Sequence, residues 1–142
     1  VVDDFNNIYK LKRGINISYK NDGKNKYLIY GIENRIEQII ANLLDNAISF
    51  SDDNKNVIVQ VSKSEDNKVY IKILDEGRGF KEKDTNKIFK RFYSNRPDKF
   101  GQHSGLGLNI VKNLVDLHNA TIKASNRQDK KGASMEIEFP KV

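Results

Sequence analysis

Residues 35–51 carry a continuous apolar stripe at the spacing of an α-helix. Apolar side chains recur at i, i+3, i+4, i+7, i+8 and i+11, and they are Ile36, Ile39, Ile40, Leu43, Leu44 and Ala47. The pattern predicts an amphipathic helix that begins near Glu33, where an acidic side chain suits the positive end of the helix dipole. A helix of this kind must bury one face against a second layer of structure, which constrains the whole fold.

The opposite face of this helix carries two asparagines, Asn42 and Asn46, one turn apart. Asparagine is a mediocre residue within a helix because its amide competes for backbone hydrogen bonds. An amide oxygen is a hard, neutral ligand that suits Mg²⁺, and the amide NH₂ can donate to a phosphate oxygen. On the helix alone, this interpretation and an ordinary solvated polar face fit equally well.

The composition indicates one soluble globular domain and excludes several classes of protein. The chain has 142 residues, 37% of them hydrophobic and 31% charged, and it contains no cysteine. Disulfide scaffolds, thiol catalysis and cysteine-ligated zinc are therefore excluded, and no run of apolar residues is long enough to span a bilayer. The net charge of +6 is spread along the chain without a basic block, so we expect no nucleic-acid partner and no membrane contact. Because the sequence starts at Val1 without a methionine, we expect a piece of a longer protein.

The remaining periodicity predicts a mixed sheet covered by helices. We expect a short helix within residues 1–12 and a second helix from Gly105 to about His118. The expected strands cover residues 16–20, 27–30, 57–61, 68–74, 121–124 and 134–139, with a hairpin joining the third and fourth. Residues 81–104 have no long periodic segment and form a long loop. This order predicts a two-layer α/β sandwich with a mixed sheet of about five strands and about three helices on one face.

A short motif, Asp75-Glu-Gly-Arg-Gly-Phe80, follows an apolar strand. On its own it is a weak pattern, because glycines with positive φ are common in turns after strands. A carboxylate at a strand end can also accept a hydrogen bond from the exocyclic amine of adenine. In that case, Gly77 and Gly79 would leave room for a flat ring against the backbone.

A second glycine motif, Ser104-Gly-Leu-Gly-Leu108, opens the last helix. Backbone N–H groups at a helix N-terminus attract anions, and glycines expose them, so the motif could cradle a phosphate. It is neither the P-loop motif nor a Rossmann fingerprint, since no βαβ unit surrounds it.

Taken together and in order, four stretches resemble the boxes of a known family. Residues 42–47 look like the N box, 75–80 the G1 box, 88–93 the F box and 104–108 the G2 box. The chain therefore resembles the catalytic, ATP-binding domain (HATPase_c) of bacterial sensor histidine kinases. This domain belongs to the GHKL superfamily, shared with gyrase, Hsp90 and MutL, whose fold is the Bergerat fold. Within the kinases, the chain looks most like the ChvG/ExoS group of alphaproteobacteria.

The resemblance implies a role for each box. Asn46 would be the Mg²⁺ ligand, with Asn42 beside it near the phosphates, and Asp75 would bind the adenine amine. Residues 94–104 would form the ATP lid, from which Arg96 could reach phosphate, although a solvated surface role fits Arg91, Arg96 and Lys99 equally well. The implied nucleotide-binding set is Asn42, Asn46, Phe50, Asp75, Gly77, Gly79, Phe80, Tyr93, Ser104, Gly105, Leu106, Gly107 and Leu108, and the implied catalytic set is Asn42, Asn46 and Arg96.

Three departures from the family pattern stand out. Ser49 occupies a position where many members carry a phosphate-reaching lysine, so a lid residue such as Arg96 would substitute. His103 stands where the G2 box usually begins with another glycine. The usual His-Gly-Gly after the last helix reads His118-Asn119-Ala120, so that turn can differ in shape.

The resemblance implies transfer of the γ-phosphoryl group of ATP to a histidine outside this chain, with Mg²⁺ as cofactor. Neither His103 nor His118 has the sequence context of a phosphoacceptor, and we expect that histidine in a dimerisation hairpin upstream of Val1. The expected partners are this hairpin and a response regulator, in a homodimeric sensor kinase of the bacterial inner membrane with this domain in the cytoplasm. A degenerate nucleotide-binding module without phosphotransfer and an anti-sigma-type serine kinase are the alternatives, of which the F box disfavours the second.

Overall fold

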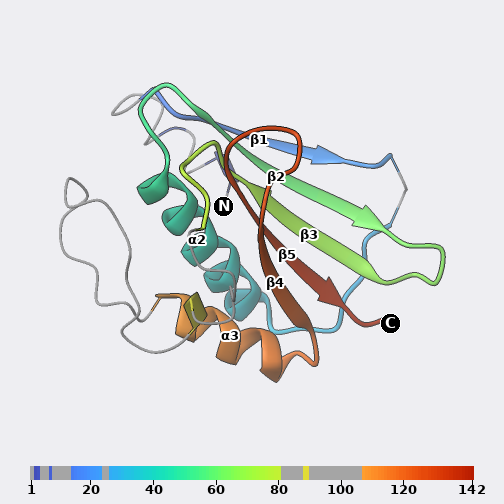
Figure 1. Ribbon diagram of the computed structural model, residues 1–142. Helices are drawn as coiled ribbons and strands as arrows, with labels where there is room; N and C mark the ends of the chain where they lie inside the picture. Colours follow the sequence, from blue (N-terminus) through green and yellow to red (C-terminus); the bar gives the residue numbers. More distant parts are fainter. Residues whose placement is uncertain (1, 4–6, 8–13, 24–25, 81–87, 90–106) are drawn as a thin grey trace.

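Five strands and two helices make up the described part of the chain (Figure 1). The computed structural model describes residues 2–3, 7, 14–23, 26–80, 88–89 and 107–142. The elements are β1 (Asn16–Asn21), α2 (Glu33–Phe50), β2 (Asn56–Lys63), β3 (Val69–Leu74), α3 (Gly107–Leu117), β4 (Thr121–Asn126) and β5 (Ala133–Phe139).

The strands form one mixed sheet in the order β1-β2-β3-β5-β4. β1 pairs with β2 in parallel, and every other neighbouring pair is antiparallel. Both described helices pack against one face of the sheet, so the molecule has two layers (Figure 1). The predicted α/β sandwich and the predicted hairpin of β2 and β3 are therefore confirmed.

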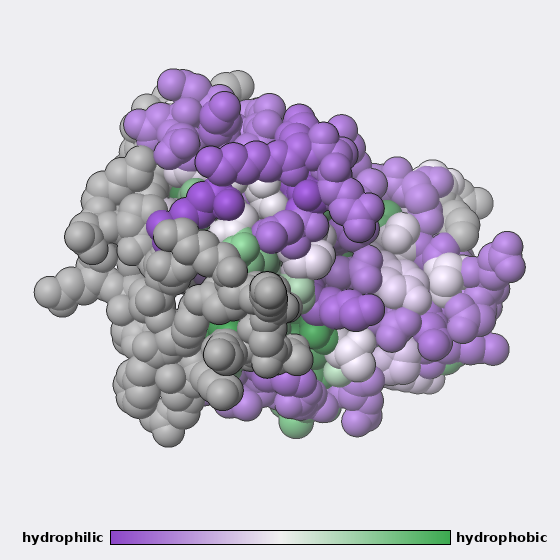
Figure 2. Space-filling model, in the orientation of Figure 1, coloured by the Kyte–Doolittle hydropathy of each residue, from purple (hydrophilic) through white to green (hydrophobic). Residues whose placement is uncertain are grey.

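The core lies between the helices and the sheet. Along β5, Met135, Ile137 and Phe139 are buried while the alternate glutamates are partly exposed, as expected for a sheet with one covered face. The opposite face carries ion pairs between neighbouring strands, such as the pair of Lys72 with Glu136 at 3.5 Å. In the space-filling view, hydrophilic residues cover most of the described surface, with small hydrophobic patches near the centre (Figure 2).

The strand that we predicted over residues 27–30 is wrong. This segment is an extended connection into α2, and β1 pairs with β2 instead. Tyr27 and Ile29 pack against the core, whereas Leu28 and Tyr30 are 60% and 75% exposed. The alternation that suggested a strand thus reflects alternate side chains touching the core, without a partner strand among the described residues.

The helices agree with the prediction in place but not in number. α2 covers the predicted segment, and α3 begins at Gly107 and ends one residue before His118. We expected about three helices and the described residues contain two, because most of the helix expected in residues 1–12 lies outside them. None of the described helices has the length and apolar character needed to cross a bilayer.

His118 links the end of α3 to the start of α2. Its Nε2 accepts a hydrogen bond from the Ile32 backbone N–H at 3.1 Å, and its Nδ1 lies 2.7 Å from the Leu114 carbonyl oxygen. The imidazole must therefore be neutral with the proton on Nδ1. This pair of hydrogen bonds gives His118 a structural role at the end of α3. Asn119, which follows, takes the left-handed conformation that glycine favours, at φ 56.

Replacing His118 tests this link. His118→Leu would leave the Ile32 N–H without its acceptor in a partly buried place and would also remove the contact with Leu114, and we expect a loss of about 2 kcal/mol in the free energy of unfolding. Urea unfolding monitored by circular dichroism measures it. Leu117→Ala is the matched control, because Leu117 is exposed and its removal should change stability little. Equal stability of the two variants would contradict the role of His118.

Candidate functional site

Asp75 lies at the end of β3, where it continues the pairing with β5. Its backbone N–H donates to the Ala133 carbonyl at 3.0 Å. The carboxylate turns back on the same pair of strands, and its Oδ1 accepts from the backbone N–H groups of Ala133 at 3.0 Å and Gly77 at 2.9 Å. The residue is only 4% exposed. Two strands and one turn therefore fix this side chain.

Burial changes the ionisation of Asp75. Loss of solvation raises the pKa of its carboxyl, and the two backbone N–H groups, followed by the charge of Arg127, lower it again in part. Glu76 adds a smaller contribution that raises the pKa. The carboxyl group is thus held in a poorly solvated place, which is unusual for an acidic side chain without a function.

The second carboxylate oxygen of Asp75, Oδ2, is called the open oxygen here because it lacks a hydrogen-bond donor within the described part of the chain. A buried acceptor without a partner is unfavourable, and a ligand that brings an N–H donor would satisfy it. The exocyclic amine of adenine is such a donor, so this position fits the predicted nucleobase.

The glycines of the motif leave no room for side chains. A Cβ on Gly77 would lie 2.4 Å from the carbonyl oxygen of Phe50, the last residue of α2. Gly79 has φ +77, and a Cβ there would lie 2.6 Å from Oδ1 of Asn126. The motif therefore packs against the backbone at the end of α2 on one side and against the side chain of Asn126 in β4 on the other.

Asn126, at the end of β4, holds the end of the motif. Its side-chain Oδ1 accepts from the Phe80 N–H at 2.6 Å, and its Nδ2 donates to the Phe80 carbonyl at 3.2 Å. The amide side chain thus pairs with the backbone as a neighbouring strand would. The sequence analysis missed this residue, because an Asn at a strand end reads as a turn signal.

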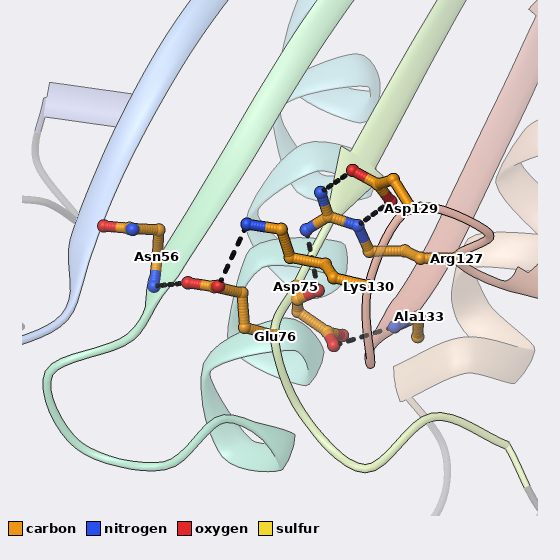
Figure 3. A network of polar contacts seen from close by, with 7 residues as sticks. All are labelled: Asn56, Asp75, Glu76, Arg127, Asp129, Lys130 and Ala133. Atoms are coloured by element: carbon orange, nitrogen blue, oxygen red, sulfur yellow. Dashed lines mark hydrogen bonds and ion pairs between the residues drawn. The ribbon is translucent and has the colours of Figure 1, made fainter.

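The turn between β4 and β5 covers the backbone of Asp75 (Figure 3). Arg127 Nη1 donates to the Asp75 carbonyl at 3.1 Å, and the same guanidinium binds Asp129 at 3.0 and 2.8 Å. Beside it, Lys130 lies 3.5 Å from Glu76, whose other oxygen accepts the Asn56 N–H at 2.7 Å. Sequence reasoning also missed Arg127, since nothing local to residues 127–132 indicates contact with a residue some 50 positions earlier.

The polar face of α2 is partly buried. Asn46 is 4% exposed, and Asn42 is partly exposed one turn earlier. The hydroxyl of Ser49 donates to the Asn46 carbonyl at 2.9 Å. Its side chain therefore folds back on its own helix, so no group at this position extends toward a ligand as a lysine would.

The structure brings some of the predicted site residues together. Phe50 meets Gly77 at the end of α2, and Arg78 lies 5.3 Å from the centre of the Phe50 ring. Leu108 is buried in the first turn of α3, and Gly107 begins that helix. The predicted residues Tyr93, Arg96, Ser104, Gly105 and Leu106 lie outside the described residues.

Residues 31–142 match the model of the family described as histidine kinase-, DNA gyrase B- and HSP90-like ATPase. The chain belongs to this family. The family that the sequence was found to resemble is therefore confirmed.

Similar proteins of this family include bacterial sensor kinases. The sensor protein ChvG of Agrobacterium fabrum is 35% identical over 139 residues, which cover 93% of this chain and 23% of ChvG. The solved catalytic domain of the histidine kinase ThkA, in a nucleotide-free form, has a TM-score of 0.82 and 26% identity, covering 99% of this chain and 88% of that one. Full-length ShkA in complex with AMPPNP has a TM-score of 0.82 at 24% identity, covering 98% and 28%, which shows a common fold. This chain thus spans less than a quarter of the length of ChvG.

The contact of Gly77 with Phe50 gives a prediction. Gly77→Ala would push a methyl group into the Phe50 carbonyl, and we expect a loss of about 1–3 kcal/mol in stability because backbone cannot yield as a side chain can. Gly107→Ala is the control, since no described atom lies within 4 Å of the added carbon. Thermal unfolding should show a clear drop in Tm for the first variant alone. A Tm unchanged in Gly77→Ala would mean that the backbone packing of the motif is wrong.

Proposed function

We propose that the chain is the ATP-binding catalytic domain of a two-component sensor histidine kinase. It would transfer the γ-phosphoryl group of ATP to a histidine of an adjoining dimerisation domain. The observation that carries the proposal is the buried carboxylate of Asp75, with one oxygen anchored by two N–H groups and the other open. Together with the flanking glycines, this arrangement suits an adenine ring and its amine.

The helix face of Asn42 and Asn46 would serve the phosphate side. Bound Mg²⁺ would neutralise the charge that phosphoryl transfer shifts toward the leaving group. Asn46 would supply an amide oxygen to the metal and Asn42 an amide group near the phosphates. The start of α3, at Gly107 and Leu108, would offer backbone N–H groups to a phosphate, together with Ser104, Gly105 and Leu106.

Two features favour transfer to a partner over hydrolysis of ATP. ATPases related to this family carry a glutamate where Asn42 stands, and an amide cannot act as a general base. Both ring nitrogens of His118 are engaged with backbone groups, and the residue is buried. His118 is therefore a poor phosphoacceptor, which supports a nucleophile from outside this chain.

The partners follow from this reaction. They would be the dimerisation domain that carries the phosphoacceptor histidine, and a response regulator that receives the phosphoryl group from it. The same ThkA was solved in complex with the response regulator protein TrrA, with a TM-score of 0.77 at 22% identity to this chain. The full protein would be a homodimeric sensor of the bacterial inner membrane, with this domain in the cytoplasm.

Asp75→Asn tests the base pocket. The amide oxygen can keep the hydrogen bonds from Gly77 and Ala133 only when its NH₂ takes the open position. Two donors would then face each other where adenine binds, and we expect ATP affinity to fall by about 2 kcal/mol or more. Isothermal titration calorimetry measures this change, and GTP should compete poorly for the wild-type chain. Equal affinity of the wild type for ATP and GTP would contradict the assignment.

The stability of the same variant separates a lost ligand contact from a damaged fold. Because the pKa of Asp75 is raised in the folded state, its ionised carboxylate destabilises the folded protein at a pH above this pKa. The destabilisation disappears when the pH falls below the ordinary pKa of aspartate, which is that of the unfolded chain. Asp75→Asn removes a buried charge and keeps both backbone hydrogen bonds. We therefore expect it to be at least as stable as the wild type at neutral pH, with the difference shrinking on acidification.

The transfer reaction is tested with two separately made parts. With labelled ATP and Mg²⁺, the present chain alone should bind nucleotide and retain no acid-labile phosphate. When the dimerisation hairpin of the same gene is added, its histidine should be labelled, and Asn46→Ala should abolish the labelling while the circular dichroism spectrum is retained. Labelling of His103 or His118, or full activity of Asn46→Ala, would refute this division of roles.

A further inference from the structure

The guanidinium of Arg127 lies inside the structure although arginine is usually a surface residue. Its side chain is only 5% exposed. It donates to the Asp75 carbonyl at 3.1 Å and to both carboxylate oxygens of Asp129, which itself is 65% exposed. An exposed carboxylate thus compensates the buried cation and points it at the backbone of the base-binding residue.

Gly132, in the same turn, also lies close to the Asp75 carbonyl. Gly132 has φ +148, and a Cβ there would lie 2.0 Å from the Asp75 carbonyl oxygen. The Arg127 N–H donates to the Gly132 carbonyl at 2.9 Å, which closes the turn. The turn between β4 and β5 therefore meets the Asp75 peptide at two points, of which one is the Arg127 guanidinium and the other is Gly132, whose carbonyl binds the Arg127 backbone N–H.

The direction of the open oxygen depends on this peptide. Oδ1 of Asp75 is tied to the N–H groups of Gly77 and Ala133. A shift of the Asp75 backbone relative to Ala133 would break one of these bonds and turn Oδ2 away from its present position. The Asp75 carbonyl is the point at which Arg127 of the turn binds this peptide (Figure 3), and this bond would oppose such a shift.

We propose that Arg127 is a positioning residue for nucleobase recognition, which holds Asp75 through its carbonyl so that the open oxygen faces the adenine amine. The proposal rests on the proposed function, because it assumes that Asp75 binds the base. Among the described residues assigned to the base pocket, Arg127 forms a hydrogen bond with Asp75 alone. The ligand group that it serves is therefore a purine with an amino group at C6, as in adenine, whereas guanine carries a carbonyl oxygen there, so Arg127 should affect ATP more than GTP.

The charge of Arg127 adds a second effect. Among the charged groups facing Asp75, Arg127 lowers the pKa of its carboxyl and Glu76 raises it. Glu76 is itself paired with Lys130 at 3.5 Å. Without the guanidinium, Asp75 would take up a proton at higher pH, and a protonated Oδ2 is a poorer acceptor for an amine. A residue with a purely structural role would not move this titration.

The experiment measures ATP affinity by calorimetry from neutral pH downward for the wild type, Arg127→Gln and Arg127→Lys. Arg127→Gln should bind ATP on the order of tenfold more weakly at neutral pH, with less discrimination against GTP. The acid limb of its affinity should move to higher pH, because the Arg127 charge lowers the pKa of Asp75. Arg127→Lys keeps the charge and should restore the acid limb. Lys112→Gln removes a charge from an exposed pair with Asp116 on α3 and should match the wild type.

Several outcomes would overturn the proposal. They are an unshifted acid limb in Arg127→Gln, an equal loss of ATP and GTP affinity, and a shift of the same size in Lys112→Gln. All titrations are made below the melting temperature of each variant. If Arg127→Gln does not fold, Arg127→Met replaces it, because methionine is also uncharged and keeps the apolar part of the side chain. Asp75→Asn separates the two hypotheses. If this variant binds ATP as tightly as the wild type, the proposed function fails. If it binds ATP more weakly but the acid limb of Arg127→Gln does not shift, only the role of Arg127 fails.

Discussion

The pairing of β3 with β5 is the contact on which the candidate site depends. The ladder from Val69 to Leu74 continues for one more residue, and that residue is Asp75. Its carboxylate binds the N–H of the first residue of β5 and the N–H of its own turn. The end of α2 packs on this turn through Phe50, and the last residue of β4 pairs with it through Asn126. Three elements thus converge on one strand end.

Burial of Asp75 opposes folding and favours binding. Among the described residues it is the buried acidic side chain, and loss of solvation raises its pKa. A carboxylate chosen for stability alone would be exposed or paired directly with a cation. Here the cation, Arg127, binds the backbone of Asp75 instead of its carboxylate. One carboxylate oxygen therefore has no hydrogen-bond partner among the described residues. The favourable free energy of a hydrogen bond to this oxygen is gained only when a ligand with an N–H donor binds.

Local sequence patterns predicted most helices and strands correctly, and they failed where the structure depends on contacts between residues far apart in the sequence. α2 was predictable from its apolar stripe, and Asp75 from its place after an apolar strand. The segment 27–30 was misread because alternation indicates extended backbone and does not reveal whether a strand is adjacent. Arg127 could not be found, since its partner Asp75 is 52 positions away and the turn that carries it reads as an ordinary polar turn. The hydrogen bond from Ile32 to His118 could not be predicted either, because it depends on the packing of α2 against α3.

The distribution of cations bears on how the phosphates would be held. On the described surface, several lysines are engaged in ion pairs within the sheet or along a helix, among them Lys72 with Glu136 and Lys112 with Asp116. Ser49 supplies no charge, and its hydroxyl is bonded to its own helix. In the proposed function, Mg²⁺ at Asn46 and the lid cations such as Arg96 must supply the positive charge that a helix lysine provides in related kinases. Phosphate binding in this chain should thus depend more on the metal than base binding does, since the base contacts of Asp75 form without it.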